Sequence, residues 1–130
     1  MLREAGVARL AADELGEPLA AAVERLASRV DRVYLHLDLD VLELPDGRAN
    51  GLAPGPEVET RGVAPEALIA AIRAIRGRVR VAAAGISAYD PEHDPAGRVR
   101  AAALRAAEEL SQVAPPRSAS DAATDHPFAR

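Results

Sequence analysis

Two aspartates, Asp38 and Asp40, stand near the end of an otherwise apolar run, VYLHLDLDVL at residues 33–42. Such a run, rich in large apolar residues, is typical of a buried strand. In a strand, residues two apart point to the same side, so both carboxylates would face one way. Charges that close repel each other, and one carboxyl would be protonated unless a cation keeps both ionised. The pair therefore predicts a site for a divalent cation such as manganese or magnesium.

The same pair has a purely structural interpretation, in which the acids cap the loop that follows the strand. We favour the metal site over this interpretation. His36 lies two residues before Asp38 and on the same side of the strand. It could be a metal ligand, a hydrogen-bond donor behind the ligands, or a buried histidine whose ring bonds the backbone. The last two roles are favoured over ligation.

A second polar cluster, YDPEHDPAG at residues 89–97, contains Asp90, His93 and Asp94. By itself, this composition is typical of a solvated turn punctuated by proline. The cluster follows the next apolar run along the chain, at the matching end of a second predicted strand. Together with Asp38 and Asp40, it is therefore a candidate for the wall of the same site.

The pattern LDLDVL also fits a phosphatase signature, with Asp38 as the nucleophile and Asp40 as the general acid. That chemistry needs a protein cation, usually lysine, beside the nucleophile and the phosphate. All sixteen basic residues of this chain are arginine, and none is lysine. A second acidic metal motif on a later strand is also missing, so the phosphatase interpretation is disfavoured.

Composition narrows the class of protein further. The chain has 130 residues, 48% of them hydrophobic, which is enough for one small domain with a core of aliphatic side chains. It contains no cysteine, which excludes disulfides and thiolate sites. A net charge of −4 and only 2% aromatic residues argue against nucleic-acid binding. Neither a signal peptide nor a run of membrane-span length is present, so we expect a cytoplasmic protein without membrane contact.

Apolar spacing and helix breakers predict the order helix, strand, long loop, helix, strand, helix. Because helices alternate with strands, we predict an α/β fold with parallel strands, in which ligands bind at the carboxyl ends of the strands. Both polar clusters lie at such ends. The expected elements are helices at 17–30, 64–77 and 98–110, strands at 33–42 and 79–88, a loop at 43–63, and a tail after residue 113 with the composition of a disordered segment.

VYLHLDLDVL, the loop sequence PGPE and the final YDPEHDPAGR together resemble the arginase family of ureohydrolases, which includes arginase, agmatinase and formimidoylglutamase. The resemblance covers about residues 1–112 and corresponds to the carboxyl-terminal part of the family's chain. It implies a three-layer α/β/α fold with a parallel sheet and two manganese ions at the carboxyl ends of central strands. It also implies that Asp38 bridges the two metals, that Asp40 binds one of them, and that a metal-activated water attacks a guanidino, amidino or formimino carbon.

Three features depart from the family pattern. The family's other metal ligands lie in Gly-Gly-Asp-His and Asp-Ala-His-x-Asp stretches, and neither occurs here. The Asp-Pro that follows the Asp-x-Asp strand is replaced by ELPDG at residues 43–47, and a Gly-Gly of the loop reads RG. Arginases also place a glutamate on the strand before the final turn, whereas AAAGISAYD at residues 82–90 has no acid before Asp90. The substrate therefore need not be arginine.

We accordingly expect an incomplete arginase-like fold at residues 1–113, truncated or split from an amino-terminal half, and a disordered tail at 114–130. The expected activity is manganese-dependent hydrolysis of a small guanidino or amidino compound, without measurable turnover by this chain alone. The expected partners are the missing amino-terminal half or further copies of the chain, as a homo-oligomer. The alternative is a non-catalytic remnant, or an interaction module, that kept the half-fold.

Overall fold

Helices and strands alternate along the chain in the predicted order. The computed structural model of the protein describes residues 9–44 and 62–112. Each predicted helix and strand has a counterpart within these residues. The elements are η1 (Ala12–Glu14), α1 (Glu17–Ala27), β1 (Arg32–Asp38), η2 (Leu39–Val41), α2 (Pro65–Arg76), β2 (Arg80–Ser87), η3 (Pro91–His93) and α3 (Arg98–Ser111), where η denotes a short 3-10 helix.

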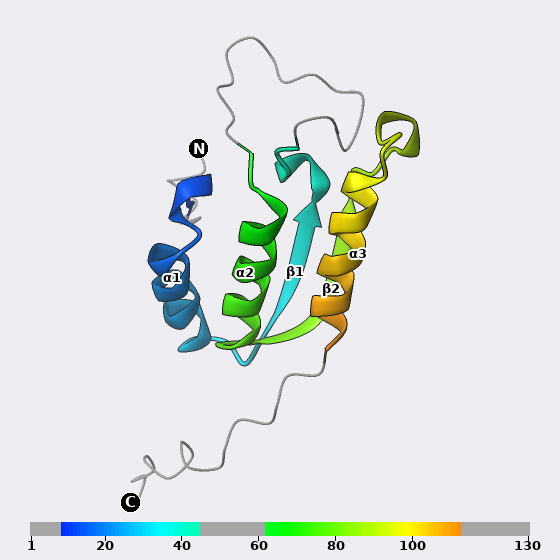
Figure 1. Ribbon diagram of the computed structural model, residues 1–130. Coiled ribbons are helices and arrows are strands. Elements are labelled where there is room, and N and C mark those ends of the chain that lie inside the picture. Colours follow the sequence, from blue (N-terminus) through cyan, green and yellow to red (C-terminus); the bar gives the residue numbers. More distant parts are fainter. Residues whose placement is uncertain (1–8, 45–61, 113–130) are drawn as a thin grey trace, which may run out of the picture.

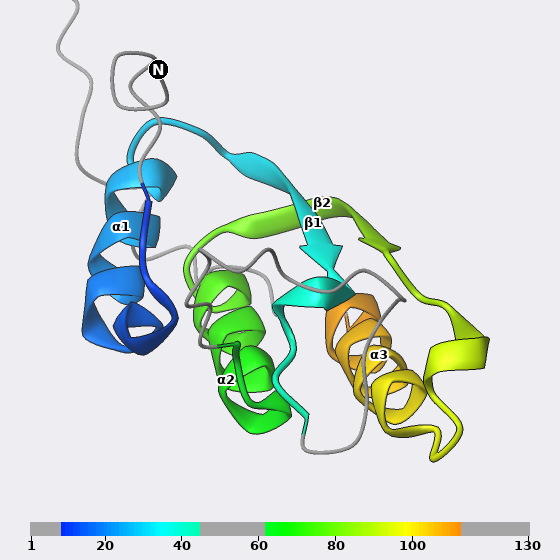
Figure 2. The same ribbon diagram turned by 90° about the horizontal axis from the view of Figure 1, so that it is seen from above.

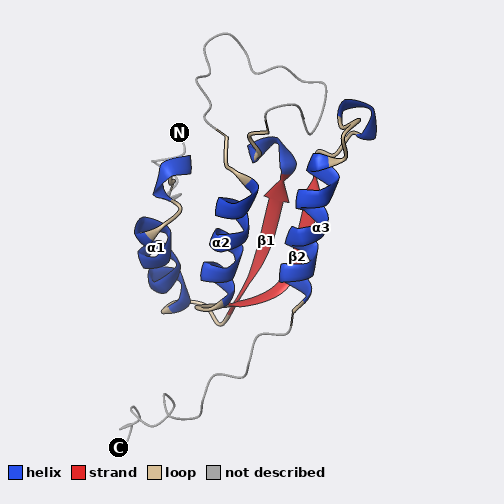
Figure 3. Ribbon diagram, viewed as in Figure 1, coloured by secondary structure: helices blue, strands red, loops and turns tan. Residues whose placement is uncertain are grey.

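The two strands form a parallel sheet, and α2 is the crossover between them (Figure 1, Figure 3). The predicted α/β fold with parallel strands is therefore confirmed. Leu37 pairs with Ile86, and Asp38 pairs with Ser87, so the carboxyl ends of both strands lie side by side. The polar segments that follow the two strands consequently lie at one end of the molecule (Figure 1).

All three α-helices lie on one side of the sheet (Figure 2). The described residues therefore form two layers of an arginase-like α/β fold, and the third layer that we expected is not among them. Burial along β1 follows this arrangement. Leu37 points toward the helices and is 4% exposed, whereas Tyr34 points away from them and is 63% exposed. His36 and Asp38 are exposed on the same side as Tyr34.

The core lies between the sheet and the helices α2 and α3. Helix α2 begins at a proline in its first turn, and its apolar side chains recur at helical spacing, as predicted. Its buried positions include Ile72, which is 2% exposed, and they pack against buried residues of α3 such as Val99. The Arg73 guanidinium of α2 donates to the Glu109 carboxylate of α3 and ties the two helices together. The largest packed cluster of buried residues consists of Leu37, Leu39, Val63, Leu68, Ile69, Ile72, Val99 and Ala106.

Several predicted boundaries were wrong. The strand predicted to run through Leu42 ends at Asp38, because the chain turns there into η2. Helix α1 ends at Ala27 and not at residue 30. Of the predicted long loop, only the two ends are described, and a parallel bridge between Leu42 and Val63 joins them. Residues 45–61 and 113–130 lie outside the described residues, and the second range includes the predicted tail at 114–130, so the domain division remains a prediction.

Candidate functional site

Asp38 is the last residue of β1, and Asp40 follows it within η2. Both residues are exposed, whereas Leu39 between them is fully buried. The Asp38 Oδ1 accepts a hydrogen bond from the backbone N–H of Asp40 at 3.1 Å and so caps η2. The sequence predicted that one continuous strand would hold both acids. Instead, the strand ends at Asp38, and a capped turn places Asp40 after the buried Leu39.

The capped turn agrees with the structural interpretation of Asp38 and Asp40, in which the acids cap the loop. The cap, however, occupies only one of the acceptor positions of the Asp38 carboxylate. An ionised carboxyl has two oxygens and about four acceptor positions, so it can accept a backbone N–H and still bind a cation. Hard and borderline divalent cations prefer oxygen donors of this kind. Among the described residues, however, no group of three or more histidine, aspartate or glutamate side chains is placed to hold a metal ion. The described residues fit manganese in the type of donor but not in the number.

His36 lies on the open face of the sheet and contacts two other side chains. Its Nε2 is 3.0 Å from the Ser87 Oγ on β2, and its Nδ1 is 3.4 Å from the Tyr34 hydroxyl. The ring is exposed, and these partners are side chains, so the interpretation as a buried histidine that bonds the backbone was wrong. The Tyr34 hydroxyl lies close above Gly85, where an added Cβ would be 2.3 Å from it.

Asp90 and His93 form a pair within the turn that follows β2. The Asp90 Oδ1 accepts the backbone N–H of Glu92 at 3.0 Å, and the Asp90 Oδ2 lies 3.0 Å from the His93 Nδ1. The bond from Glu92 and the neighbouring imidazole lower the pKa of Asp90, against a smaller opposing effect of burial. The carboxylate is thus held ionised by its own turn.

Asp94 has a structural role that the sequence did not reveal. Its side chain is buried, and its carboxylate accepts the backbone N–H groups of Val99 at 3.2 Å and Arg100 at 2.9 Å at the start of α3. Burial raises the pKa of Asp94, but these backbone bonds and the Tyr89 hydroxyl outweigh it, so the net pKa is lowered. Burial and the Asp94 charge raise the pKa of Tyr89 in turn. Asp94 therefore caps a helix from inside the fold.

Comparison with known proteins gives one match. A model of the arginase family matches residues 1–112 of the chain. The chain belongs to the arginase family. No curated protein and no solved structure matches it. The resemblance read from the sequence is thus confirmed at the level of the family, which places the chain with the ureohydrolases in general, whereas its correspondence to the carboxyl-terminal part of the family's chain stays a prediction.

In this arginase-family chain, residues 82–89 contain no acid, whereas the resemblance leads us to expect one on the strand before the final turn. Ala88 has φ 64°, in the left-handed region that residues with a side chain rarely adopt. The left-handed residue turns the chain between β2 and the segment that holds Tyr89 and Asp94. None of the described helices is long and apolar enough to cross a bilayer.

The structure brings the predicted site residues to one end of the molecule, but it divides them into local groups. Asp38 bonds the chain at Asp40, Asp90 pairs with His93, and Asp94 caps α3. The sequence analysis missed two partners of His36. Tyr34 lies two residues before His36 in the strand, so the alternation of side chains could have identified it. Ser87 is 51 residues away from His36, and its position beside the ring follows only from the register of the sheet.

Proposed function

We propose that this chain supplies Asp38 and Asp40 to the metal centre of a manganese-dependent hydrolase that cleaves a C–N bond in guanidino, amidino or formimino compounds. One observation supports this most. The two carboxylates are exposed at the carboxyl end of a parallel strand in a chain of the arginase family. Ligands of parallel α/β sheets bind at that edge.

The proposal requires further ligands from outside the described residues. Hard divalent cations take about six oxygen or nitrogen donors, and Asp38 and Asp40 supply two side chains. The rest would come from a segment with the Gly-Gly-Asp-His and Asp-Ala-His-x-Asp motifs of the family. Manganese would activate the attacking water there. Of the groups in this chain, the N–H of Asp40 fixes the direction of the Asp38 carboxylate, and the two charges attract the cations.

The proposed substrate preference follows from the absence of an acid at residues 82–89, on β2 and directly after it. A guanidinium cation needs an acid beside it. Near the end of β2 the side chains are Ser87 and Ala88, and neither is charged. We therefore propose that arginine is not the preferred substrate among the guanidino, amidino and formimino compounds. A cytoplasmic location without nucleic-acid or membrane partners, and assembly into a homo-oligomer, belong to the same proposal.

The test is manganese binding by the chain alone, measured by the loss of the electron paramagnetic resonance signal of free manganese. We expect weak binding, with a Kd on the order of 10⁻⁴–10⁻³ M, as for sites with few protein ligands. The Asp38→Asn and Asp40→Asn variants should each lose it, and an Asp13→Asn variant, altered at an exposed acid of η1, should keep it.

The second arm adds a separate polypeptide that carries the two missing motifs and measures urea or ammonia release from arginine, agmatine and formimidoylglutamate. We expect tighter binding in the mixture and no turnover by the chain alone. Robust manganese-dependent turnover by the lone chain, lost in both aspartate variants, would show that a complete site already exists. Binding that is equal in all variants would instead favour the alternative, a non-catalytic module whose acids only cap turns.

A further inference from the structure

Two arginines occupy paired positions where the parallel strands begin. Arg32 is the first residue of β1, Arg80 is the first residue of β2, and the two are direct partners in the register of the sheet. Both are exposed. In the described part of the chain, neither guanidinium has an ion pair or hydrogen bond with an acid, and the exposed Asp31 next to Arg32 does not pair with either.

This arrangement is unfavourable without a counter-charge. Neighbouring strands lie about 4.8 Å apart, and register partners point to the same side of the sheet. Like charges directly opposite each other on neighbouring strands destabilise the pair. Arginine side chains are not deprotonated in proteins, so the repulsion cannot be relieved by loss of a proton. An anion between the two side chains would remove it.

Three arginines near this end of the molecule are paired with acids. Arg73 and Arg76 bond Glu109, and Arg78 bonds Glu24, so these two acids are engaged. Arg73, Arg76 and also Arg25 lie in the last turns of helices, where the negative end of the helix dipole favours a cation. Arg32 and Arg80 lie on strands, so that explanation does not extend to them.

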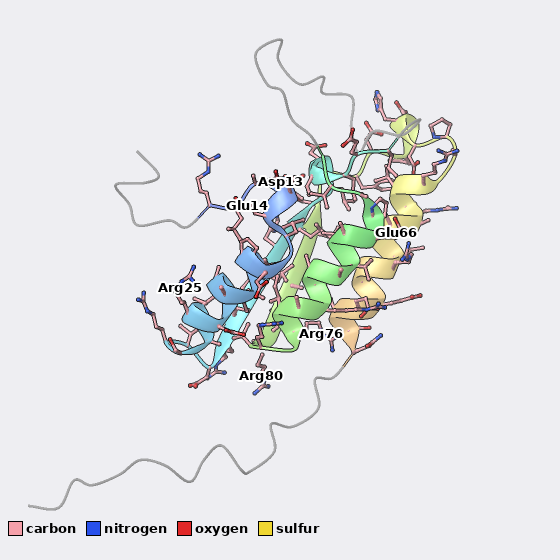
Figure 4. All side chains as sticks on the ribbon, turned by 60° about the vertical axis from the view of Figure 1, so that its left-hand side comes forward. Asp13, Glu14, Arg25, Glu66, Arg76 and Arg80 are labelled. Carbon is pink, nitrogen blue, oxygen red and sulfur yellow. The ribbon has the colours of Figure 1, made fainter. Side chains whose placement is uncertain are left out.

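The pair also lies far from the carboxylates. Six residues of extended chain separate Arg32 from Asp38, which corresponds to about 20 Å. Figure 4 shows the labelled acids Asp13, Glu14 and Glu66 toward one end of the molecule and Arg80 at the other. Any anion held by the two arginines would therefore occupy a site separate from the candidate metal centre.

We propose that Arg32 and Arg80 form a clamp for a phosphate dianion, either free or as a monoester. Guanidinium groups present parallel N–H donors that match the oxygens of phosphate, and two of them balance a charge of about −2. Tyr34 is the next residue of β1 on the same side as Arg32, and its ring is largely exposed. A monoester with an aromatic group could place that group against this ring, whereas inorganic phosphate could not.

The experiment is a titration of the protein with inorganic phosphate and with phenyl phosphate at constant ionic strength, followed by ³¹P line broadening and by Tm. The variants are Arg32→Gln and Arg80→Gln, and the matched control is Arg25→Gln, an exposed arginine on α1 without an acidic partner among the described residues. We expect both ligands to raise the Tm of the wild type, each clamp variant to weaken binding by about tenfold or more, and the control to bind as the wild type does.

A second readout is independent of the ligand. In phosphate-free buffer of low ionic strength, Arg32→Gln and Arg80→Gln should each raise the Tm, because either one removes the repulsion between the two guanidinium groups. Tyr34→Ala should weaken phenyl phosphate and leave inorganic phosphate unchanged if the site takes monoesters, and should change neither if it takes free phosphate. Equal loss of binding in Arg25→Gln, an equal rise of Tm with chloride, or a lower Tm of both clamp variants without ligand would overturn the proposal.

Discussion

Replacing Asp94 by alanine should destabilise the protein strongly, although this residue was expected in the wall of the site. The Asp94 carboxylate accepts the first backbone N–H groups of α3, from Val99 and Arg100. These groups have no partner within the helix, because the first turn of a helix leaves its N–H groups unpaired. Gly97 precedes the helix with φ +65°. This left-handed residue turns the chain so that the Asp94 carboxylate lies beside the N–H groups of the first helical turn.

The magnitude follows from those bonds and from their surroundings. Loss of a helix cap costs about 0.5–2 kcal/mol, and a buried donor left without a partner costs about 1–3 kcal/mol. Asp94 is 5% exposed, and Val99 is fully buried, so water cannot readily replace the carboxylate at the Val99 N–H. We expect the free energy of unfolding to fall by about 2–4 kcal/mol, a large part of the ~5–15 kcal/mol available to a typical domain.

Urea denaturation followed by circular dichroism measures this change. With the m-value of a small protein, the midpoint should fall by about 1–2 M. Asp94→Asn keeps one acceptor oxygen and should lose about half as much, which gives a measurable variant if Asp94→Ala does not fold. Asp31→Ala, at an exposed acid without a cap bond, is the matched control. A free energy of unfolding for Asp94→Ala within about 0.5 kcal/mol of the wild-type value would refute the reasoning.

The same residue predicts a dependence on pH. Because the folded pKa of Asp94 is lowered from its ordinary value of 3.8, the cap contributes fully above that value. Its contribution is lost as the pH falls through the folded pKa, since the unfolded state then binds the proton more readily. The difference in stability between the wild type and Asp94→Asn should therefore shrink below about pH 4 and stay constant between pH 5 and 8.

Two further predictions concern packing and charge. Gly62→Ala should lower the free energy of unfolding by about 1–3 kcal/mol in urea denaturation, because an added Cβ would lie 2.7 Å from the backbone nitrogen of Glu43. Gly16→Ala, where nothing lies within 4 Å, should be close to neutral. Glu109→Gln should lower the urea midpoint because it removes the partner of Arg73, whose hydrogen bond lowers the pKa of Glu109. That loss should disappear in acid, below the ordinary carboxyl pKa of 4.5, and an unchanged midpoint at pH 7 would show that the bond between α2 and α3 contributes nothing.

The sequence predicted those parts of the fold that depend on local periodicity. Helix α2 has proline in its first turn, apolar residues such as Ile69 and Ile72 at helical spacing, and a glycine directly after it, so its bounds differed from the prediction by one residue at each end. The alternation of helices and strands likewise predicted parallel pairing, because a helical crossover returns the chain to the end of the sheet at which the first strand began.

The features of the fold that the sequence did not predict depend on contacts between distant or unexpected groups. The apolar pattern continues past Asp38 to Leu42, so nothing in it marks the end of the strand, which is set by the bond from Asp38 to the N–H of Asp40. The cap formed by Asp94 requires the left-handed turn at Gly97, and its spacing of five residues to Val99 differs from the usual capping pattern. The opposed arginines appear only when the register of the sheet is known.

The observed cap and the proposed metal binding are compatible roles for Asp38, and the turn helps to reconcile them. The backbone N–H of Asp40 donates to the Asp38 Oδ1 and leaves acceptor positions of the carboxylate open to a cation. It also restricts the rotation of the side chain, so less freedom is lost when a cation binds the remaining lone pairs. The substitution chosen therefore matters. Asn at position 38 keeps an oxygen for the cap and removes the charge, whereas Ala removes both, so the comparison of the two separates the contribution of Asp38 to folding from its contribution to a metal centre.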